Sequence, residues 1–508
     1  MRRTLALLTV LFGLTAGGPA PAWSATGQLQ LTVIDKDTRK PIACRIHLKS
    51  PNGKPRKAEH MPFWQDHFVF PGSITLKLPL GGYTFELERG LEYVTCSGNF
   101  TIENFADDSK EVELRRFVDM SKEGWWSGDI DVRRPVNDIE LLMRADDLHV
   151  VPVITATNDK NDWAGKTLPK QGLIRGDENR WYHVLGGVYQ RAGGTFLALN
   201  LDEPLLVGDP GAEYPPPAIL VQKARQSASA WIDWNRPYGW DLPMLVANHL
   251  IDSIEIAHGQ IGRERTINNE NGGKPRDPKR YPGAWGNAEW SQQIYFHLLN
   301  CGLRIPPSAG SGSGVSPNPV GYNRMYVHVD GDFSYEKWWE SLRAGRVMIT
   351  NGPLLRPNVE GEMPGHVFKG EAGKTVALNV GLTLSTRDPI SYLEIIKDGQ
   401  VVDSIRVEEF VKMRKLPKMT FDASGWFLIR AVADVKQTYR FGLTGPYFVE
   451  FNYQPRISKR SVQFFLDWLY ERARQIDLAD ATQRAEVIEY HRKARDFWQD
   501  LLKRANAE

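Results

Sequence analysis

The chain has 508 residues, of which 42% are hydrophobic and 24% are charged, and its formal net charge is +2. This composition is that of a soluble globular protein, and it excludes both a disordered chain and a protein that binds polyanions through bulk positive charge. The length is too great for one ordinary domain and predicts about three domains. We therefore expect no nucleic-acid partner.

The N-terminus, residues 1–25, has the pattern of an export signal peptide. Arg2 and Arg3 precede a short apolar stretch, and Ala20 and Ala22 fit the small-residue rule for cleavage. The stretch is too short to cross a bilayer, and no later run reaches about 18 apolar residues. We expect an exported protein, periplasmic or extracellular, with no transmembrane segment once the signal is removed.

Between residues 27 and 116, apolar residues alternate with polar ones, which predicts short β-strands. Turn residues such as Asn52-Gly53 and Gly81-Gly82 separate the alternating segments. The region 27–116 is therefore predicted to be an antiparallel β-sandwich. The alternating positions are Leu29, Leu31, Val33, Ile42, Cys44, Ile46, Leu48, Ile74, Leu76, Leu78, Tyr83, Phe85 and Leu87.

Two segments of this region, LTVIDKDTRKPIACRIHL and LPLGGYTFELERGLEY, resemble the transthyretin-like or carboxypeptidase-regulatory-like modules of exported proteins. The resemblance implies a spacer or adhesion unit that seldom carries chemistry. Cys44 and Cys96 both lie on the expected inward side of early strands, and an oxidising compartment would permit a disulfide between them. Two small core residues are an equally good interpretation. Cys301 would remain single and buried.

From residue 119 to residue 355, short apolar strands alternate with segments of helical length. VVPVITATN and ASAWIDWN are typical of buried parallel strands, and NDIELLMRADDL and AEWSQQIYFHLLNCGL of amphipathic helices. This alternation predicts an α/β layer or barrel whose chemistry lies in loops at the carboxyl ends of the strands. Candidate positions are 129–134, Asn158-Asp159 and Asn235-Arg236.

A second β-rich module is predicted over 365–455, with Asp398-Gly399 as a hairpin turn. The tail, 458–508, is predicted to be helical. Ser458 is a suitable N-cap for a first helix, and residues 485–502 form a second amphipathic segment. We expect a helical pair docked on the body of the protein, with the first helix burying Val462, Phe465, Leu466 and Leu469.

The segment WWSGDIDVRRPVNDIELLMRADDLHVVPVITATND resembles the start of PHP-type metallohydrolases, in particular the exported CehA/McbA branch. DSIEIAHG, LLNCGLRIPPSAGSGSG, YNRMYVHV and LRAGRVMITNGPLL follow in the order of that family. The resemblance covers about residues 125–355. It implies a distorted β/α barrel at 119–355, where histidines and carboxylates at the strand ends hold two or three divalent metals that hydrolyse phosphate or other esters.

Most ligand positions of that family are substituted in this chain. Asp131 and Arg133 stand where the first motif, G-D-L-H-x-H-R, has its two histidines. The T-D-H triplet is replaced by residues 157–159, the H-P dipeptide by Arg236-Pro237, and the S-D-x-H ending by residues 311–314. If a cation is retained, the candidate ligands are Asp129, Asp131, Asp159 and Glu255.

Arginine cannot release its proton and therefore cannot bind a metal, but it supplies fixed positive charge. We expect an Asp/Arg network in place of the metal cluster, with Asp131 and Asp159 as the carboxylate partners. The candidate ligand-binding residues are Arg133, Arg134, Arg236 and His258. His258 is included because it follows Glu255 at a strand end, although a core histidine is an open alternative. The glycine-rich segment around Gly310 is predicted to be a flexible loop.

Three functions remain open from the sequence. The first is a catalytically impaired, metal-free relative of the hydrolases that binds an anionic small molecule or acts as a scaffold, with no cofactor and no confident catalytic residue. The second is an active phosphoesterase or ester hydrolase whose carboxylate-rich site holds a divalent metal, with Zn, Mn, Mg or Ca as candidates. The third is an adhesion protein that binds polysaccharide through its β-modules.

Overall fold

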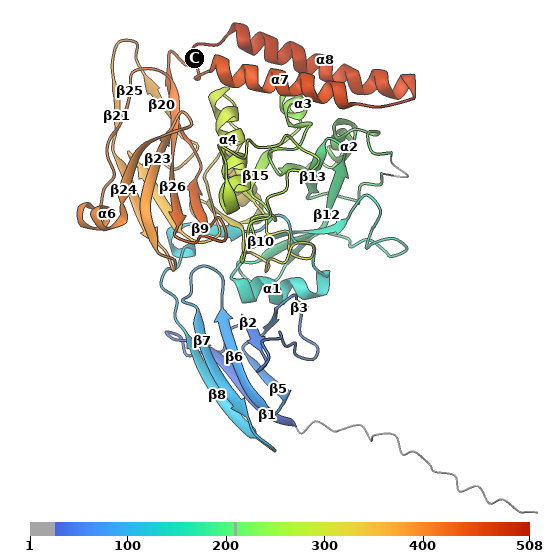
Figure 1. The fold of residues 1–508 in the computed structure, drawn as a ribbon, viewed down its shortest axis with the longest axis vertical. Coiled ribbons are helices and arrows are strands. Elements are labelled where there is room, and N and C mark those ends of the chain that lie inside the picture. The colour runs from blue at the N-terminus through green and yellow to red at the C-terminus, as the bar shows by residue number, and fades with distance from the viewer. Residues whose placement is uncertain (1–25, 208–210) are drawn as a thin grey trace, which may run out of the picture.

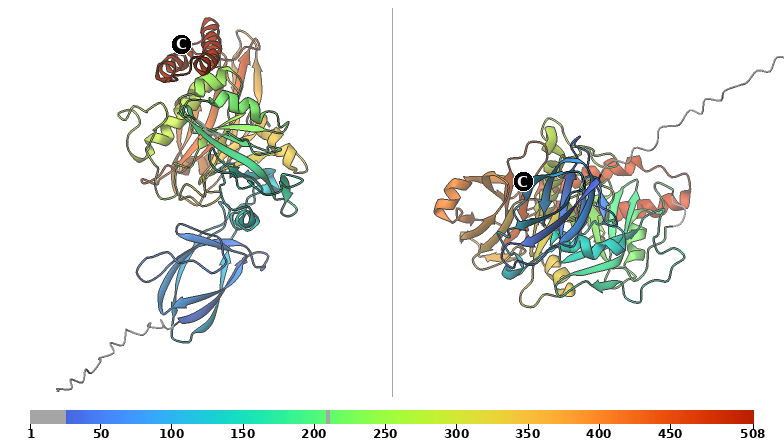
Figure 2. Two further views of the ribbon diagram at one scale, coloured as in Figure 1. Left: turned by 90° about the vertical axis from the view of Figure 1, so that its right-hand side faces the viewer. Right: turned by 90° about the horizontal axis from the view of Figure 1, so that it is seen from below.

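The computed structural model describes residues 26–207 and 211–508, so the predicted signal at 1–25 lies outside the described residues. Over this range the chain is a multidomain α/β protein that is rich in strands and has eight α-helices (Figure 1). A small β-module begins the described chain. It is followed by a large sheet with helices on it, and the last two helices lie on the side opposite the N-terminal module (Figures 1 and 2).

The N-terminal module consists of two facing sheets around one apolar core, which includes Leu31, Ile46 and Leu87. Because β1 and β8 pair in parallel, the expectation of a wholly antiparallel sandwich is wrong. β8 reaches β1 only after the chain has crossed through the other sheet, and such a crossover permits parallel pairing. The first sheet contains, in order, β5 (Ser73–Pro79), β1 (Thr26–Asp35) and β8 (Asp107–Leu114). The second sheet contains, in order, β3 (Phe63–Trp64), β4 (His67–Phe70), β2 (Cys44–Lys49), β6 (Gly81–Glu88) and β7 (Cys96–Ile102).

The three cysteines are free thiols. Cys44 lies on β2 and Cys96 on β7, and these strands flank β6. Two strand spacings amount to about 9.5 Å, which exceeds the limit of about 7 Å between the Cα atoms of a disulfide. Cys44 and Cys301 are buried, as small core residues would be.

A central run of strands, from β16 to β18 in sheet order, follows and forms part of one large sheet. The pairs β9–β10, β10–β12, β14–β15 and β15–β16 are parallel, whereas the hairpin β12–β13 is antiparallel and interrupts the predicted alternation of strand and helix. In sheet order the strands are β16 (Pro307–Ala309), β15 (Ser253–Ala257), β14 (Trp231–Asn235), β13 (Gly194–Leu199), β12 (Trp181–Arg191), β10 (Val150–Ala156), β9 (Trp125–Gly128), β17 (Arg324–His328) and β18 (Val347–Thr350), with β11 (Leu173–Arg175) beside β12.

The residues that follow β9 lie between β10 and the segment after β16. Val132 forms parallel bridges with both Val153 and Ser313. The N–H of Arg133 donates to the carbonyl of Ser313 at 2.8 Å, and the N–H of Ile154 donates to the carbonyl of Val132 at 2.8 Å. The carboxyl ends of β9, β14 and β15 are thereby brought together.

Part of the C-terminal β-module extends the same sheet, because β27 pairs with β18 and β26, β23, β24, β28 and β20 follow it. The pairs β19–β22 and β21–β25 form two separate two-stranded sheets. At the predicted hairpin turn, Asp398 and Gly399 have φ angles of 51° and 84°, the left-handed conformation that this dipeptide favours, so the turn is confirmed. The strands are β19 (Leu354–Val359), β20 (Val367–Gly370), β21 (Val376–Leu378), β22 (Val380–Ser385), β23 (Ile390–Lys397), β24 (Gln400–Arg406), β25 (Met419–Phe421), β26 (Gly425–Ala433), β27 (Phe441–Thr444) and β28 (Tyr447–Phe451).

The tail forms the predicted helical pair, which packs on α3 and α4. Ser458 caps α7 by accepting the N–H of Ser461, and the indole of Trp498 donates to the carbonyl of Pro243 at 3.0 Å. No helix in the described ranges is long and apolar enough to cross a membrane. The helices are α1 (Ile139–Asp146), α2 (Pro217–Ala224), α3 (Leu242–Ala247), α4 (Gly286–Asn300), α5 (Tyr335–Arg343), α6 (Val407–Met413), α7 (Lys459–Gln475) and α8 (Ala481–Lys503).

The N-terminal module meets the rest of the protein, here called the body, through buried charges. Arg45 forms ion pairs with Glu88 of its own module and with Asp146 at the end of α1, and all three side chains are less than 10% exposed. The indole of Trp64 donates to the carbonyl of Ser316 at 2.9 Å. The module is therefore docked by specific polar contacts, which the sequence-based expectation of a spacer did not include.

Replacing Arg45 with methionine should strongly destabilise this junction. The substitution keeps most of the side-chain volume but leaves Glu88 and Asp146 buried without their guanidinium, at a cost of about 3–5 kcal/mol. The matched control is Arg39→Met, which removes surface ion pairs to Glu111 and Glu113 and should cost about 1 kcal/mol or less. Urea unfolding followed by tryptophan fluorescence measures both changes, and equal losses would contradict the role assigned to Arg45.

Candidate functional site

Asp131 and Arg133 form an ion pair at the carboxyl end of β9. The Nε and Nη2 atoms of Arg133 lie 2.7 Å and 2.9 Å from the two carboxylate oxygens of Asp131. The pairing is bidentate, the geometry in which a guanidinium binds a carboxylate most strongly. Asp131 is buried and Arg133 is about one-fifth exposed. The predicted partnership between these two residues is present.

Asn235 connects this ion pair to Glu255. Its Nδ2 atom lies 2.5 Å from Oε2 of Glu255 and 3.3 Å from Oδ2 of Asp131. Burial raises the pKa of Glu255 well above its usual value, and the nearby charges of Asp131 and Asp233 raise it further, so the protonated acid is favoured. The register that pairs Asn235 with Glu255 across parallel strands places both side chains on the same face.

Gly310 allows the loop after β16 to pass over these carboxyl groups. A Cβ atom at this position would lie 2.6 Å from the Cβ of Asp131 and 2.9 Å from Oε1 of Glu255. Both distances are shorter than a real Cβ contact, so any other residue would displace the loop or the carboxyl groups.

Asp233 is a buried carboxyl group of this cluster that the sequence interpretation missed. Its Oδ2 atom accepts hydrogen bonds from the hydroxyls of Ser253 and Ser308. Burial raises its pKa to about 7, although these two hydrogen bonds act in the opposite direction. The alternating polar residues in WIDWN carry the same signal as those in DIDVR, because an acid at every second position of a buried strand indicates a polar interior face.

Asp129 binds backbone amides. Its two oxygens accept the N–H groups of Ser311 at 2.9 Å, Gly321 at 2.7 Å and Asp131 at 3.2 Å. Burial raises its pKa to about 7 against these hydrogen bonds. The glycine-rich segment is held in place by these contacts, and residues 309–313 are buried, so the expectation of a flexible loop is wrong.

Three of the predicted site residues do not join this cluster. Asp159 is exposed, and no hydrogen bond or ion pair within the described ranges links it to Asp131. The guanidinium of Arg134 lies 5.1 Å from the ring of Trp64, and Arg236 donates to the hydroxyl of Thr195 at 3.2 Å. No ion pair among the described residues joins Asp159 to an arginine, so that expected partnership is wrong, and the three predicted arginines contact three different partners.

His258 is a core histidine. It is fully buried, its Nε2 atom lies 3.0 Å from the hydroxyl of Ser291, and its ring packs 5.9 Å from that of Tyr238. Burial lowers its pKa to about 3, with a further contribution from the charge of Arg236. A neutral imidazole in a closed packing position favours the structural alternative over a ligand-binding role.

The donors around these carboxyl groups do not fit a cluster of two or three divalent metals. Arg133 and Asn235 direct N–H groups at the oxygens of Asp131 and Glu255 that a metal would need. Asp129 is occupied by backbone amides. An arginine and amide donors in these positions stabilise negative charge directly. Among the described residues of this cluster, only Oε1 of Glu255 and Oδ1 of Asp233 are carboxylate oxygens without a hydrogen-bond partner, fewer than two or three metals would need.

A separate cavity lies between the N-terminal module and the body. Its volume is about 350 Å³, and five guanidinium groups but only three carboxylates line it. A polar cleft of about 880 Å³ lies beside it and shares Glu86, Arg263 and Arg440 with it. The charged residues of the cavity are Arg45, Arg263, Arg324, Arg387, Arg440, Glu86, Glu88 and Asp388.

Two of these arginines lack a close carboxylate partner. Arg324 is buried and donates to the carbonyls of Gly321 and Asp146. Arg387 donates to carbonyls and to the hydroxyl of Thr95, and its nearest carboxylate within the described chain, Glu88, is 3.8 Å away. Burial lowers the pKa of Arg387, so its positive charge is incompletely compensated.

No protein-family model matches the sequence, and no curated protein matches it significantly. Among solved structures, the TIE protein of Bacillus anthracis is similar at 19% identity over 22% of this chain and 20% of its own, with a TM-score of 0.15. A β-glucuronidase of Bacteroides uniformis is similar at 10% identity over 84% of this chain and 59% of its own, with a TM-score of 0.17. The chain thus spans less than two-thirds of each, and similarity this low informs neither fold nor function.

Replacing Asp233 with asparagine should change how stability depends on pH. With its pKa raised from 3.8 to about 7, Asp233 holds a proton in the folded state that the unfolded state has already released, so its contribution to stability falls as the pH rises through about 7. The melting temperature of Asp233→Asn should therefore rise relative to the unmodified protein between about pH 4 and pH 8.

The control for this measurement is Asp159→Asn, an exposed carboxylate of the same type, which should show no comparable change with pH. If the melting temperatures of Asp233→Asn and of the unmodified protein differ by the same amount at every pH, then Asp233 ionises as it does in water and the assigned pKa shift is contradicted.

Proposed function

We propose that the chain is an exported binding protein for a small anionic ligand, built on a PHP-type barrel whose metal centre has been replaced by an Asp/Arg network. The motif order over residues 125–355 supports the PHP-type fold. The ion pair of Asp131 with Arg133, at the two positions where the family has histidines, supports the loss of the metal centre. Export rests on the signal-like segment at 1–25.

The observation that carries the ligand assignment is the cavity with five arginines between the N-terminal module and the body. Arg324 and Arg387 face it without a carboxylate of their own at short range. A buried, uncompensated guanidinium is energetically unfavourable, and a bound anion would neutralise it. The Nε atom of Arg440 and the hydroxyl of Tyr322 are also buried there without a hydrogen-bond partner among the described residues.

The ligand class follows from the size and chemistry of the cavity. A volume of about 350 Å³ suits a small molecule, and its lining contributes hydrogen-bond donors more than apolar surface. Guanidinium groups bind carboxylates and phosphates in a bidentate manner. The ligand is therefore a small phosphate ester or an acidic sugar. Because the same guanidinium donors recognise phosphate and carboxylate groups, the binding experiment below compares a phosphate with an acidic sugar.

Binding should weaken at least tenfold in Arg387→Gln and Arg440→Gln, because each variant removes a charge-assisted donor worth about 1.5–3 kcal/mol. Thermal shift and calorimetry with inorganic phosphate and glucuronate measure this loss. Arg236→Gln, which removes an arginine outside the cavity, is the matched control and should bind like the unmodified protein. Equal binding by all variants, or no binding of either probe, would contradict the proposal.

The active-hydrolase alternative has its own measurement. Hydrolysis of p-nitrophenyl phosphate in the presence of Mn²⁺ or Zn²⁺ that is abolished by Asp131→Asn and by Glu255→Gln would establish a carboxylate-bound metal in the barrel and overturn the proposed function.

A further inference from the structure

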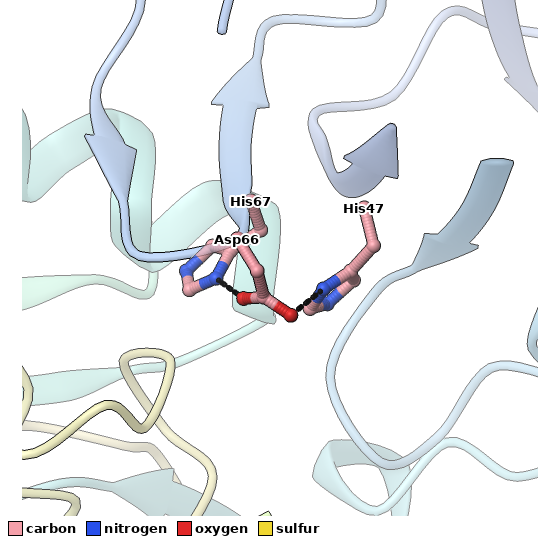
Figure 3. A group of neighbouring side chains, drawn as sticks. All are labelled: His47, Asp66 and His67. Atoms are coloured by element: carbon pink, nitrogen blue, oxygen red, sulfur yellow. Dashed lines mark hydrogen bonds and ion pairs between the residues drawn. The ribbon is translucent and has the colours of Figure 1, made fainter. Parts of the chain in front are cut away.

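Two histidines and an aspartate converge on the N-terminal module, outside the barrel and outside the arginine-lined cavity. His47 lies on β2, Asp66 at the tip of the hairpin between β3 and β4, and His67 at the start of β4. In Figure 3 the carboxylate of Asp66 lies between the two imidazoles. Its oxygens are 3.0 Å from Nδ1 of His47 and 3.0 Å from Nδ1 of His67.

The sheet register builds this arrangement. β2 and β4 are antiparallel, and Ile46 pairs with Phe68, so the next step along the register sets His47 opposite His67. The ring centroids of the two histidines are 5.1 Å apart. The hairpin that carries Asp66 is held by Trp64, whose indole donates to Ser316 of the body.

The spacing of the donor atoms suits a transition-metal ion. One ligand atom from each residue lies within 4.8 Å of the other two. Zinc ligands at about 2.0–2.1 Å in a tetrahedron are about 3.4 Å from one another. Each imidazole Nδ1 lies 3.0 Å from a different carboxylate oxygen of Asp66, Oδ2 for His47 and Oδ1 for His67, within a few tenths of an ångström of this value. Side-chain adjustments alone would therefore bring the three donors around one ion.

The second ring nitrogen of His47 faces a carboxylate, as it usually does in a histidine that binds a metal. If Nδ1 of His47 binds an ion, its Nε2 carries the proton, and Nε2 lies 3.5 Å from Oε2 of Glu88 without another hydrogen-bond partner among the described residues. A metal-bound histidine usually directs its second nitrogen at a carboxylate in this way. Glu88 is itself fixed by Arg45 at 2.6 Å.

The site is also accessible. His47 and His67 are buried, but the side chain of Asp66 is 36% exposed, and both His47 and Asp66 line the cleft of about 880 Å³. Three protein donors leave one position of a tetrahedral ion open towards the cleft. A second group, formed by His47, Glu86 and Glu88, is less suitable because Arg263 and Arg45 already pair with its carboxylates.

We propose that His47, Asp66 and His67 bind one divalent transition-metal ion of the zinc class at the rim of this cleft. Imidazole nitrogen and carboxylate oxygen together favour Zn²⁺ over the hard cations Mg²⁺ and Ca²⁺, which prefer oxygen ligands alone. The proposal is independent of the proposed function, because His47, Asp66 and His67 lie outside residues 119–355 and do not line the arginine-lined cavity; Glu88, the outer contact of His47, is shared with that cavity.

Calorimetric titration of the chelator-treated, dialysed full-length chain with ZnCl₂ tests the proposal. We expect one Zn²⁺ per chain, and Co²⁺ in its place should give the visible absorption of a tetrahedral site. His67→Gln and Asp66→Asn should each weaken binding about 100-fold or more, and Glu88→Gln about 10–100-fold. His366→Gln is the matched control, since His366 contacts Glu362 on the surface at 3.1 Å and should leave binding unchanged.

Thermal unfolding without metal establishes that each variant is folded, and Asp66→Asn, at a partly exposed turn, should retain the fold if His67→Gln does not. Absence of zinc binding by the unmodified protein would show that Asp66 simply bridges two imidazoles by hydrogen bonds, and would overturn the proposal. Zinc binding that persists in Asp66→Asn and His67→Gln but disappears in Asp131→Asn would overturn it as well, and would move the metal to the barrel.

Discussion

The N-terminal module and the body are joined by charges that are buried from water, and this constraint determines the shape of the cavities between them. Arg45 lies between Glu88 and Asp146, which come from different parts of the structure. Ions buried in this way are tolerated only when each meets its partner, so a small rotation of the module would leave several of them unpaired. The docking orientation is therefore specific, and the polar cavity and cleft beside Arg45 have a defined shape.

The same rule explains the polar cluster at the carboxyl ends of β9, β14 and β15. Carboxyl groups that a metal could otherwise neutralise are neutralised here in three ways. Asp131 pairs with Arg133, Asp129 accepts backbone N–H groups, and burial favours the protonated form of Glu255. Each way reduces the cost of a bare buried anion. The described residues thus compensate most of this buried charge among themselves.

The sequence predicted features that depend on neighbouring residues. The Asp398-Gly399 hairpin, the Ser458 cap and the pairing of Asp131 with Arg133 involve residues at most three positions apart. It missed Asp233, whose serine partners lie on two other strands, and the contact of Arg134 with Trp64. The cavity could not be predicted, because its arginines come from segments separated by up to several hundred residues and converge only through tertiary packing.

The hairpin formed by β3 and β4 links the cleft to the body of the protein. The indole of Trp64 donates a hydrogen bond to the carbonyl of Ser316, and Asp66 in the adjacent turn lines the cleft. The loop that contains Ser316 follows the segment held by Asp129 over the barrel carboxyl groups. A ligand that requires the docked arrangement of module and body must also stabilise that arrangement, by the amount of its differential binding. Because the cleft is lined by residues of both the module and the body, a ligand bound there would favour their docked arrangement, in addition to the Trp64 hydrogen bond and the Arg45 ion pairs.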